Sequence, residues 1–505
     1  MTGDLAGLGP NPTRATPPIE LVVGAGDPHA HLSVEPVPID GETLDRLAAT
    51  CPTSTDIGER AEAGRDWWPL ALHWSLHGEV PTIPAVICRP TSTAQVAAIL
   101  DIASAERIPV TTAGGRSGVC GASIPLHGGI VLDTTAMHGV VDVDEISLVA
   151  EVLPGTFGPD FEGELNGRGF TCGHFPQSFD ISTVGGWVAC RGAGQYSTRY
   201  GKIEDMVVGL EVVLADATVV RTGGAPRAAT GPDLTSLFVG SEGTLGVITR
   251  VWMRIHSKPA ASVKVAYGFP DFAAGVEACR RILRRGATPA VLRLYDGAES
   301  ARGHNGDGTE CVLLIFDEAD PAVVASVAAI VSEECAAARQ LDVALVDHWM
   351  AHRNDTSALQ GLTRKGFVVD TMEIAASWSA LGRIFDDARS ALLAVPTARA
   401  ATCHLSHSYA DGACLYFTFA ATPPPDQVEA TYAALWDAGT RAVLAAGGNL
   451  SHHHGVGLNR ARFVAEALGP AFGVLQAVKS ALDPLGILNP GKMGLTSTFG
   501  DTVWP

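Results

Sequence analysis

Three consecutive histidines, His452 to His454, carry side chains that could hold a metal ion or transfer protons. They lie in the sequence SHHHGVG, and a simple interpretation is a metal-binding or solvated tract. Adjacent residues of an extended chain point to opposite faces, so the three rings cannot easily bind one ion. No carboxylate or cysteine lies close to them in sequence. We therefore expect no metal site here.

Three glycine-rich stretches in the first half of the chain could hold a phosphate-containing ligand. They are TTAGGRSGVCGAS at 111–123, STVGGWVACRGAGQYS at 182–197 and FVGSEGTLGVITRV at 238–251. Glycine lets the backbone approach a ligand closely, and successive N–H groups in such a turn form a concavity suited to a pyrophosphate. A single stretch of this kind is usually just a tight turn. Three in one region favour a ligand.

Several other chemistries lack their sequence signature. No GxGxxG opens a helix within a strand–helix–strand unit, and the GxxxxGK[ST], HExxH and GxSxG patterns are absent. The ten cysteines are scattered, without CxxC spacing. Neither a zinc ribbon nor a thioredoxin-like pair is indicated.

Two kinds of secondary-structure pattern divide the chain. Residues 83–90 read as a buried strand, 92–108 as an amphipathic helix and 109–115 as a strand that enters the first glycine turn, which predicts a unit with parallel strands. From about residue 259, helical stretches alternate with strand-like runs such as ECVLLIFDE and ACLYFTFAA. This second pattern predicts an α+β domain with an antiparallel sheet.

Length and charge limit the classes of function. The 505 residues suggest more than one domain, and the formal charge of −19 argues against a nucleic-acid or anionic-membrane partner. No run of apolar residues is long enough for a transmembrane segment, and the N-terminus does not resemble a secretory signal. We expect a cytoplasmic protein with a small-molecule substrate. The oligomeric state, a homodimer included, is left open.

The glycine-rich stretches resemble the FAD-binding domain of the vanillyl-alcohol oxidase or p-cresol methylhydroxylase type. Over about residues 66–495 the chain resembles the alkyl-dihydroxyacetonephosphate synthases (alkylglycerone-phosphate synthases), most specifically in YGKIED at 200–205 and SHHHGVG at 451–457. The resemblance implies an α+β fold with four parts: an N-terminal, partly irregular arm (1–60), a two-subdomain FAD-binding domain (61–258), a cap domain with an antiparallel sheet (259–480) and a returning C-terminal segment (481–505).

The same resemblance assigns FAD contacts by motif. They are Thr112, Ala113, Gly114, Gly115, Arg116, Ser117 and Gly118; Gln177, Ser178, Ser182 and Thr183; Cys190, Arg191, Gly192 and Ala193; and Ser241, Glu242, Gly243, Thr244, Leu245, Gly246 and Val247. Gln177 and the run from Cys190 depart from the family pattern, but main-chain donors do most of this binding. Arg116 stands where relatives that bind flavin covalently have a histidine, so noncovalent FAD is expected. Cys120 and His174 are the alternative tethers.

For the reacting groups, the resemblance implies Tyr409 as the acid–base residue, with His452, His453 and His454 against the flavin and the substrate. A histidine that titrates near pH ~6.5 can both bind an oxyanion and move a proton. Arg293 and His174 match positions that support the site. Two cationic positions of the family are lost, because Leu359 replaces a substrate-binding Arg and Leu458 a Lys. Arg353 and Arg364 lie nearby but out of register.

The loss of these two cationic positions distinguishes between an oxidoreductase and a synthase. The flavin site is retained, whereas recognition of a phosphate group loses charge-assisted bonds. We therefore expect a diverged FAD-dependent oxidoreductase that acts through flavin N5 on a small polar, non-phosphorylated hydroxy or amino substrate. The alternative is a true synthase, a transferase that exchanges acyl for alkyl oxygen without net redox change. A non-catalytic flavin-binding protein is the weakest hypothesis.

Overall fold

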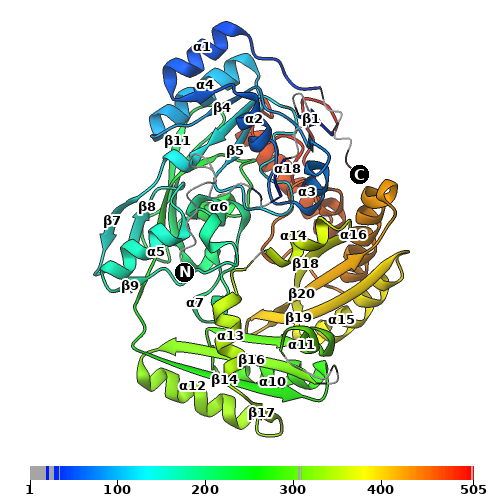
Figure 1. Cartoon of the computed structure of the whole chain (residues 1–505). Helices are drawn as coiled ribbons and strands as arrows, with labels where there is room; N and C mark the ends of the chain where they lie inside the picture. Colours follow the sequence, from blue (N-terminus) through cyan, green and yellow to red (C-terminus); the bar gives the residue numbers. More distant parts are fainter. Residues whose placement is uncertain are drawn as a thin grey trace.

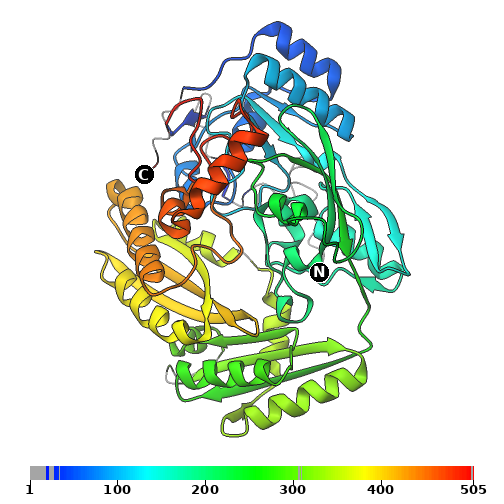
Figure 2. The ribbon, with the colours of Figure 1, turned by 180° about the vertical axis from the view of Figure 1, so that it is seen from behind.

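The protein folds into two lobes, shown from opposite sides in Figures 1 and 2. A computed structural model describes residue 17, residues 19–21, 28–32, 35–304, 308, 310–355, 357–501 and residue 504. The first lobe contains the glycine-rich stretches and the second contains a large antiparallel sheet. In Figure 1, α1 (Gly41–Thr50) and α12 (Pro321–Glu334) lie at opposite ends of the molecule.

The first subdomain of the first lobe is built on the predicted strand–helix–strand unit. Its sheet has the order β2-β4-β6-β5, and β4, β5 and β6 are parallel. Helix α4 begins after Ser92, whose side chain accepts a hydrogen bond from Gln95 N–H, and it ends at Arg107 in a left-handed conformation. The bounds are β2 Thr53–Ser54, β4 Val86–Cys88, α4 Thr93–Glu106, β5 Val110–Ala113 and β6 Ile130–Asp133.

The expected irregular arm is regular in its second part. Besides α1, this region contains α2 (Ile57–Ala63), and the apolar side chain of Leu47 in α1 packs into the core of the first subdomain. Most of residues 1–34 lie outside the described part of the chain. Two short strands and a helix complete the chain before β4: β1 His29–Ala30, α3 Pro69–Ser75 and β3 Glu79–Val80.

The second subdomain is a five-stranded antiparallel sheet in the order β11-β10-β12-β8-β7. Its strands are β7 Val140–Asp144, β8 Val149–Val152, β10 Val207–Val213, β11 Val219–Gly223 and β12 Val247–Arg254. A small pair joins β9 Phe170–Thr171 to β13 His256–Ser257. The helices are α5 Gly158–Gly167, α6 Val184–Cys190, α7 Ser197–Tyr200, α8 Ile203–Met206 and α9 Leu234–Phe238.

The second lobe has a seven-stranded antiparallel sheet, as predicted, in the order β17-β14-β16-β15-β19-β20-β18. Its strands are β14 Ala261–Phe269, β15 Val291–Tyr295, β16 Cys311–Ala319, β17 Arg339–Leu341, β18 Val368–Ser377, β19 Ala398–Ser408 and β20 Gly412–Ala421. Its helices, besides α12, are α10 Phe272–Arg284, α11 Gly297–Gly303, α13 Ala344–His352, α14 Ser357–Thr363, α15 Trp378–Leu393 and α16 Val428–Ala445.

The two faces of this sheet differ in polarity. One face is apolar, and side chains such as Leu294, Leu405 and Phe417 share a core with α10, α12, α15 and α16. On the opposite face, residues that alternate with them include Arg293, His404, Tyr416 and Glu373, because successive side chains of a strand point to opposite faces. Segregation of polar side chains on one face gives the second lobe a polar surface at the boundary between the lobes.

The chain returns to the first lobe after α16. A loop that contains the three histidines precedes α17 (Val464–Leu468) and α18 (Ala471–Leu482). Val478 of α18 packs on the core of the second subdomain, and Leu488 enters the core of the first. Figure 2 shows α18, in red, lying on the first lobe. In the described part of the chain, no helix has the length and apolar character to cross a membrane.

Candidate functional site

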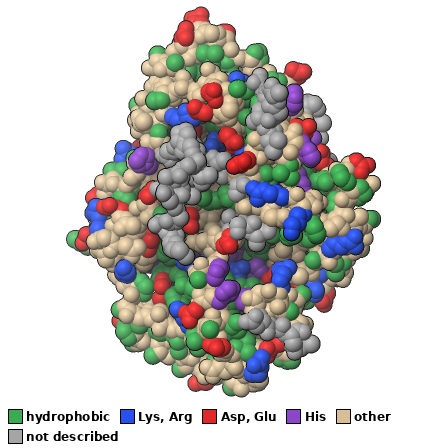
Figure 3. Space-filling model, in the orientation of Figure 1, with side chains coloured by type: hydrophobic (Ala, Val, Ile, Leu, Met, Phe, Trp, Pro, Cys, Tyr) green, Lys and Arg blue, Asp and Glu red, His purple; other side chains and the backbone are tan. Residues whose placement is uncertain are grey.

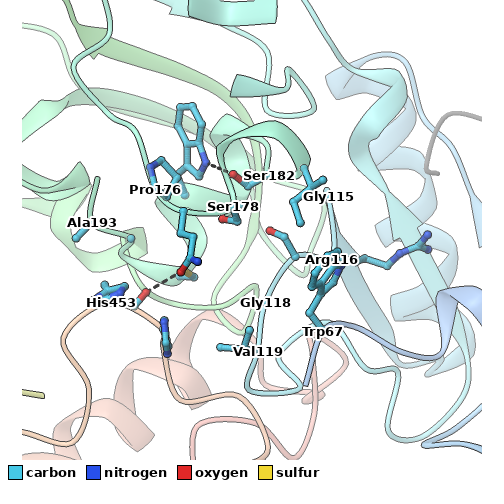
Figure 4. A pocket seen from close by; sticks show the side chains of 18 of the residues that line it. Trp67, Gly115, Arg116, Gly118, Val119, Pro176, Ser178, Ser182, Ala193 and His453 are labelled. Atoms are coloured by element: carbon cyan, nitrogen blue, oxygen red, sulfur yellow. Dashed lines mark hydrogen bonds between the residues drawn. The ribbon is translucent and has the colours of Figure 1, made fainter. Parts of the chain in front are cut away.

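A cavity of about 560 Å³ lies between the glycine-rich stretches and the polar face of the second lobe. Figure 3 shows the molecule hollowed between the lobes, with histidine side chains gathered at the edge of the hollow. Both lobes contribute to its wall, including Gly115 and Ser182 from the first and His453 from the returning loop (Figure 4). A ligand in this cavity would contact the glycine-rich stretches on one side and ionisable groups of the second lobe on the other.

The first two glycine-rich stretches pack directly against one another. A side chain at Gly114 would place its Cβ 2.4 Å from Thr183 Oγ1, and one at Gly115 would place it 2.3 Å from the Ile181 carbonyl oxygen. Thr183 caps α6, where its hydroxyl accepts a hydrogen bond from Gly186 N–H. Glycine is therefore required at 114 and 115 so that the strand end and the helix start can form one continuous wall.

Two buried carboxylates hold the histidine loop. Glu373 Oε1 accepts hydrogen bonds from the N–H groups of His452, His453 and His454, at 3.2, 2.9 and 2.6 Å. Glu242, from the third glycine-rich stretch, accepts two further N–H groups, those of residues 456 and 457, at 2.5 and 2.7 Å. The loop is thus bound to both lobes through its backbone, which leaves the histidine rings available for other contacts.

Glu373 is itself neutralised by a buried cation. Arg460 donates a hydrogen bond to Glu373 Oε2, and both side chains are fully buried. Burial alone would raise the pKa of Glu373, but Arg460 and His454 more than offset this and hold the pKa well below its usual range. Glu373 is therefore ionised at neutral pH and can accept the three N–H groups as a carboxylate.

The three histidines have different environments. His453 and His454 line the cavity, whereas His452 does not, and its Nε2 lies 2.9 Å from the Tyr409 hydroxyl. His452 Nδ1 contacts His453 Nδ1 at 2.9 Å. Burial lowers the pKa of all three rings, to about 3 for His452. Neutral imidazoles in the cavity wall can accept a proton from a bound molecule.

A fourth histidine joins this group through an irregularity in β19. His407 has a φ of 49°, and the pairing of β19 with β20 shifts register between Ser406 and Ser408. This bulge brings Ser406 and His407 together onto the cavity wall. Ring nitrogens of His407, His452 and His453 lie within 4.8 Å of one another, a spacing that a metal ion could use.

The structure corrects the argument that adjacent histidine rings point to opposite faces, because His452 Nδ1 and His453 Nδ1 lie 2.9 Å apart. That no metal binds here stays a prediction, which the contacts within the group favour. His407 Nδ1 is 2.7 Å from Ser197 Oγ, and the rings of His452 and His453 contact each other. The ammonium group of Lys202 donates to the His452 carbonyl oxygen at 2.6 Å. A nearby fixed cation and rings that already have partners disfavour a second positive charge, so we assign no metal.

Tyr409 is not where the sequence interpretation needs it. Its side chain contacts His452 but does not line the cavity, and burial raises its pKa. Tyr416, seven residues further along, does line the cavity; its hydroxyl donates to Thr371 Oγ1 at 3.0 Å, and its ring stacks on that of His404. The signal that could have found Tyr416 is the alternation of ACLYFTFAA, which places it on the polar face.

The comparisons with known proteins agree with this geometry. Residues 84–223 match the family model described as an FAD binding domain, and residues 258–493 match that of the C-terminal domain of FAD linked oxidases. The uncharacterized FAD-linked oxidoreductase YgcU of Escherichia coli (strain K12) is 32% identical over 436 residues, which cover 81% of this chain and 89% of that protein. The chain belongs to the FAD-linked oxidase family.

Other members of the FAD-linked oxidase family include enzymes of different types. Alkyldihydroxyacetonephosphate synthase of Dictyostelium discoideum is 30% identical over 457 residues, 82% of this chain and 74% of that protein. Glycolate oxidase subunit GlcD of Bacillus subtilis (strain 168) is 28% identical over 451 residues, 86% of this chain and 93% of that protein.

Solved structures agree on the fold. A structure of alkyldihydroxyacetonephosphate synthase superposes with a TM-score of 0.77 at 26% identity, covering 94% of this chain and 90% of that one. Substrate-bound p-cresol methylhydroxylase has a TM-score of 0.73 at 19% identity, covering 92% and 99%. The fold is therefore the expected p-cresol methylhydroxylase type, and the protein is an FAD-dependent enzyme.

The first-lobe wall of the cavity fits FAD. Among the described residues, Thr112 Oγ1 and Arg116 Nε are buried without a hydrogen-bond partner, and both residues line the cavity. Burial lowers the pKa of Arg116, so a nearby anionic group would be stabilising. A hydroxyl and a guanidinium beside a glycine turn suit a diphosphate. In Figure 4, Arg116 and Trp67 lie at the end of the cavity away from His453.

Most of the residues assigned to FAD by motif lie on this wall, and five do not. Those that line the cavity are Thr112 to Gly118, Gln177, Ser178, Ser182, Thr183, Cys190, Gly192, Ala193, Glu242, Gly243 and Gly246. Arg191 is half exposed and pairs with Glu204, and Ser241 and Thr244 are buried outside the wall. Leu245 and Val247 belong to hydrophobic cores. Val247 is the first residue of β12, and its side chain packs into the core of the first subdomain.

The supporting residues, in contrast, are all on the cavity wall. Arg293, His174 and Arg353 all line the cavity. The guanidinium of Arg353 contacts the rings of Phe175 and Tyr196 and donates to Gln195 Oε1 at 2.9 Å. His174 is fully buried, and burial lowers its pKa to about 3. His174 is thus a neutral part of the wall.

The two leucines expected at cationic positions of the synthases are in different places. Leu359, on α14, lines the cavity and is 38% exposed. Leu458 is buried in the hydrophobic core, where its Cβ lies 3.2 Å from the position of a Cβ at Gly121. Leu458 therefore does not face the cavity, and its presence gives no information about the ligand. Arg364 is exposed and does not line the cavity.

FAD should leave the polypeptide when the protein is denatured by acid. No cysteine or histidine follows the first glycine pair in the tethering position, and the Cys120 side chain is buried in a core rather than on the cavity wall. The His174 nitrogens do border the cavity, so His174 is the tether to test. Flavin absorbance should appear in the supernatant after precipitation. Colour that stays with the precipitate would contradict the noncovalent assignment.

Proposed function

We propose that this protein is an oxidoreductase that acts through flavin N5 on a small polar, non-phosphorylated hydroxy or amino substrate. The observation that carries the proposal is Leu359 on the cavity wall, where the synthases have a substrate-binding Arg. Arg353, which could replace it, already contacts two aromatic rings and Gln195. At position 359 the wall is therefore apolar and offers a phosphate dianion no charge-assisted bond.

Two side chains are positioned to handle the substrate proton. His453 lines the cavity with its Nδ1 in contact with His452, and among the described residues no hydrogen bond is made to its Nε2. Because burial keeps the ring neutral, Nε2 can accept a hydrogen bond from a substrate O–H or N–H group. The lowered pKa makes the ring a weak base, which suffices because the substrate proton becomes strongly acidic as the hydride leaves. Burial also raises the pKa of Tyr416, so its hydroxyl stays protonated and can turn its one donated hydrogen bond from Thr371 Oγ1 to the substrate oxygen.

In the proposed oxidation, the cofactor accepts the two electrons that the substrate loses. When bound, FAD supplies the acceptor for a hydride at N5. The substrate C–H bond loses the hydride, and its O–H or N–H proton goes to His453, which leaves a carbonyl or imine product. The family member whose name states an oxidation of this kind is the glycolate oxidase subunit.

Anaerobic mixing with candidate substrates tests the proposal. A small hydroxy acid, hydroxy compound or amine should remove the flavin absorbance band without any other electron acceptor present. An acyl-dihydroxyacetone phosphate with a fatty alcohol should neither bleach the band nor form an ether product. Ether formation without bleaching would replace this proposal by the alternative, a genuine alkyl-dihydroxyacetonephosphate synthase.

A further inference from the structure

Arg293 is a cation on the polar face of the second lobe that no carboxylate neutralises directly. It lies on β15 and lines the cavity, and among the described residues no carboxylate oxygen is within 4.0 Å of its guanidinium. Its Nε is buried without a hydrogen-bond partner. A charge held in this way costs free energy unless a ligand compensates it.

A hydrogen bond to His404 fixes the orientation of Arg293. Arg293 Nη2 lies 2.6 Å from His404 Nε2, and His404 Nδ1 lies 3.0 Å from Glu299 Oε2. Arginine can only donate and a carboxylate only accept, so His404 Nε2 accepts and its Nδ1–H donates. Burial lowers the pKa of His404 to about 4, which agrees with this neutral tautomer. Neutral His404 thus separates Arg293 from Glu299.

Aromatic rings support the guanidinium from the sides. Its central carbon lies 5.5 Å from the ring centroid of Tyr295 and 5.8 Å from that of Trp349. The side chain is therefore held rigid by packing, and little side-chain entropy remains to be lost when a ligand binds.

His304 supplies a second unpartnered nitrogen on the same wall. It is nine-tenths buried, its ring packs on Tyr295 at 4.1 Å, and its Nδ1 is buried without a hydrogen-bond partner. His304 and Arg293 both contact the ring of Tyr295 and both line the cavity. Burial, and secondly the charge of Arg293, lowers the pKa of His304 to about 4, so the ring is neutral. A neutral imidazole can present an N–H donor beside the guanidinium.

We propose that Arg293 and His304 form a receptor for a carboxylate group of the substrate. This inference rests on the proposed function, in that it takes the cavity as the substrate site, and it narrows the substrate to a small hydroxy or amino acid. One guanidinium with one neutral donor matches a single negative charge. A phosphate dianion would keep one charge uncompensated in a buried site.

Calorimetric titration of the FAD-loaded protein tests the receptor. The probes are methoxyacetate, a carboxylate with no hydroxyl proton to lose, its neutral amide methoxyacetamide, and inorganic phosphate. Arg293→Met should weaken methoxyacetate binding about 10- to 100-fold, the usual worth of a charge-assisted bond, and leave methoxyacetamide binding unchanged. Arg383→Met is the matched control, because Arg383 is 63% exposed and lies outside the cavity wall. It should bind methoxyacetate as the unchanged protein does.

Two further variants keep the test decisive. His304→Ala should weaken methoxyacetate binding by a smaller factor, and it replaces Arg293→Met if that variant does not retain FAD. Arg293→Lys should recover part of the methoxyacetate affinity that Arg293→Met loses. Lysine keeps the positive charge but lacks the planar guanidinium, which can bind a carboxylate through two N–H groups.

Equal binding of methoxyacetate by Arg293→Met and the unchanged protein would overturn the receptor, as would phosphate that binds as tightly as methoxyacetate. The proposed oxidation would survive either result if hydroxy compounds still bleach the flavin. Charge-selective binding without bleaching by any substrate would instead support the receptor and refute the oxidation.

Discussion

Tyr416→Phe should lower turnover by about 10²-fold or more while FAD content is unchanged. The substitution removes only the hydroxyl of a residue that lines the cavity, and removal of one hydrogen-bond donor to a reacting oxygen commonly costs 10²- to 10³-fold. The ring, which stacks on His404 at 4.8 Å between centroids, is retained. Steady-state turnover with a substrate that bleaches the flavin is the measurement.

Tyr409→Phe is the matched control for this prediction. It removes a hydroxyl that contacts His452 Nε2 behind the cavity wall, so turnover should fall by no more than a few-fold. The reverse order, with Tyr409→Phe inactive and Tyr416→Phe active, would return the acid–base role to Tyr409. That result would also require the histidine loop to move when substrate binds.

Arg460→Met should destabilise the protein by about 3–5 kcal/mol at neutral pH, the typical cost when one partner of a buried ion pair is removed. Glu373 and Arg460 are both fully buried, and the carboxylate left behind would have only N–H, hydroxyl and histidine partners. Thermal or denaturant unfolding of the FAD-loaded protein would measure the loss.

The pH dependence of this effect has a definite sign. In the unchanged protein the pKa of Glu373 is lowered, so its stabilisation is present above the pKa of ~4.3 of an unfolded Glu and is lost as pH falls. In Arg460→Met, burial without the cation should raise the pKa of Glu373. Acid should then protonate the unpaired carboxylate and remove its buried charge. The stability difference should therefore shrink toward pH 4. A difference independent of pH would show that Arg460 stabilises by packing alone.

Arg441→Met provides the control for a surface arginine. Arg441 is 55% exposed and pairs with Asp437 and Glu466. Exposed ion pairs contribute about 0–1 kcal/mol, so this variant should unfold close to the unchanged protein. A loss as large as that of Arg460→Met would argue that charge removal in general, rather than the buried pair, destabilises the fold.

The sequence by itself determined the cofactor and the fold class. Glycine at 114 and 115 is demanded by close backbone packing, which is a local requirement and is therefore visible as a cluster in the sequence. The strand–helix–strand unit around α4 and the alternation within the strands of the second lobe are local as well, since they follow from the periodicity of side chains. These features predicted a lobe that binds a phosphate-containing ligand and a second domain with an antiparallel sheet, and the family resemblance of the glycine-rich stretches implied that the ligand is FAD.

Only the tertiary structure decided which side chains meet in the site. No carboxylate lies near His452 to His454 in sequence, yet Glu373, about 80 residues earlier, binds their backbone. Tyr409 and Tyr416 occur in one motif, but a β-bulge at His407 and the hairpin that follows turn the first away and leave the second on the polar face. Strand pairing and one left-handed residue fix these outcomes. They depend on partners distant in sequence, which local pattern does not specify.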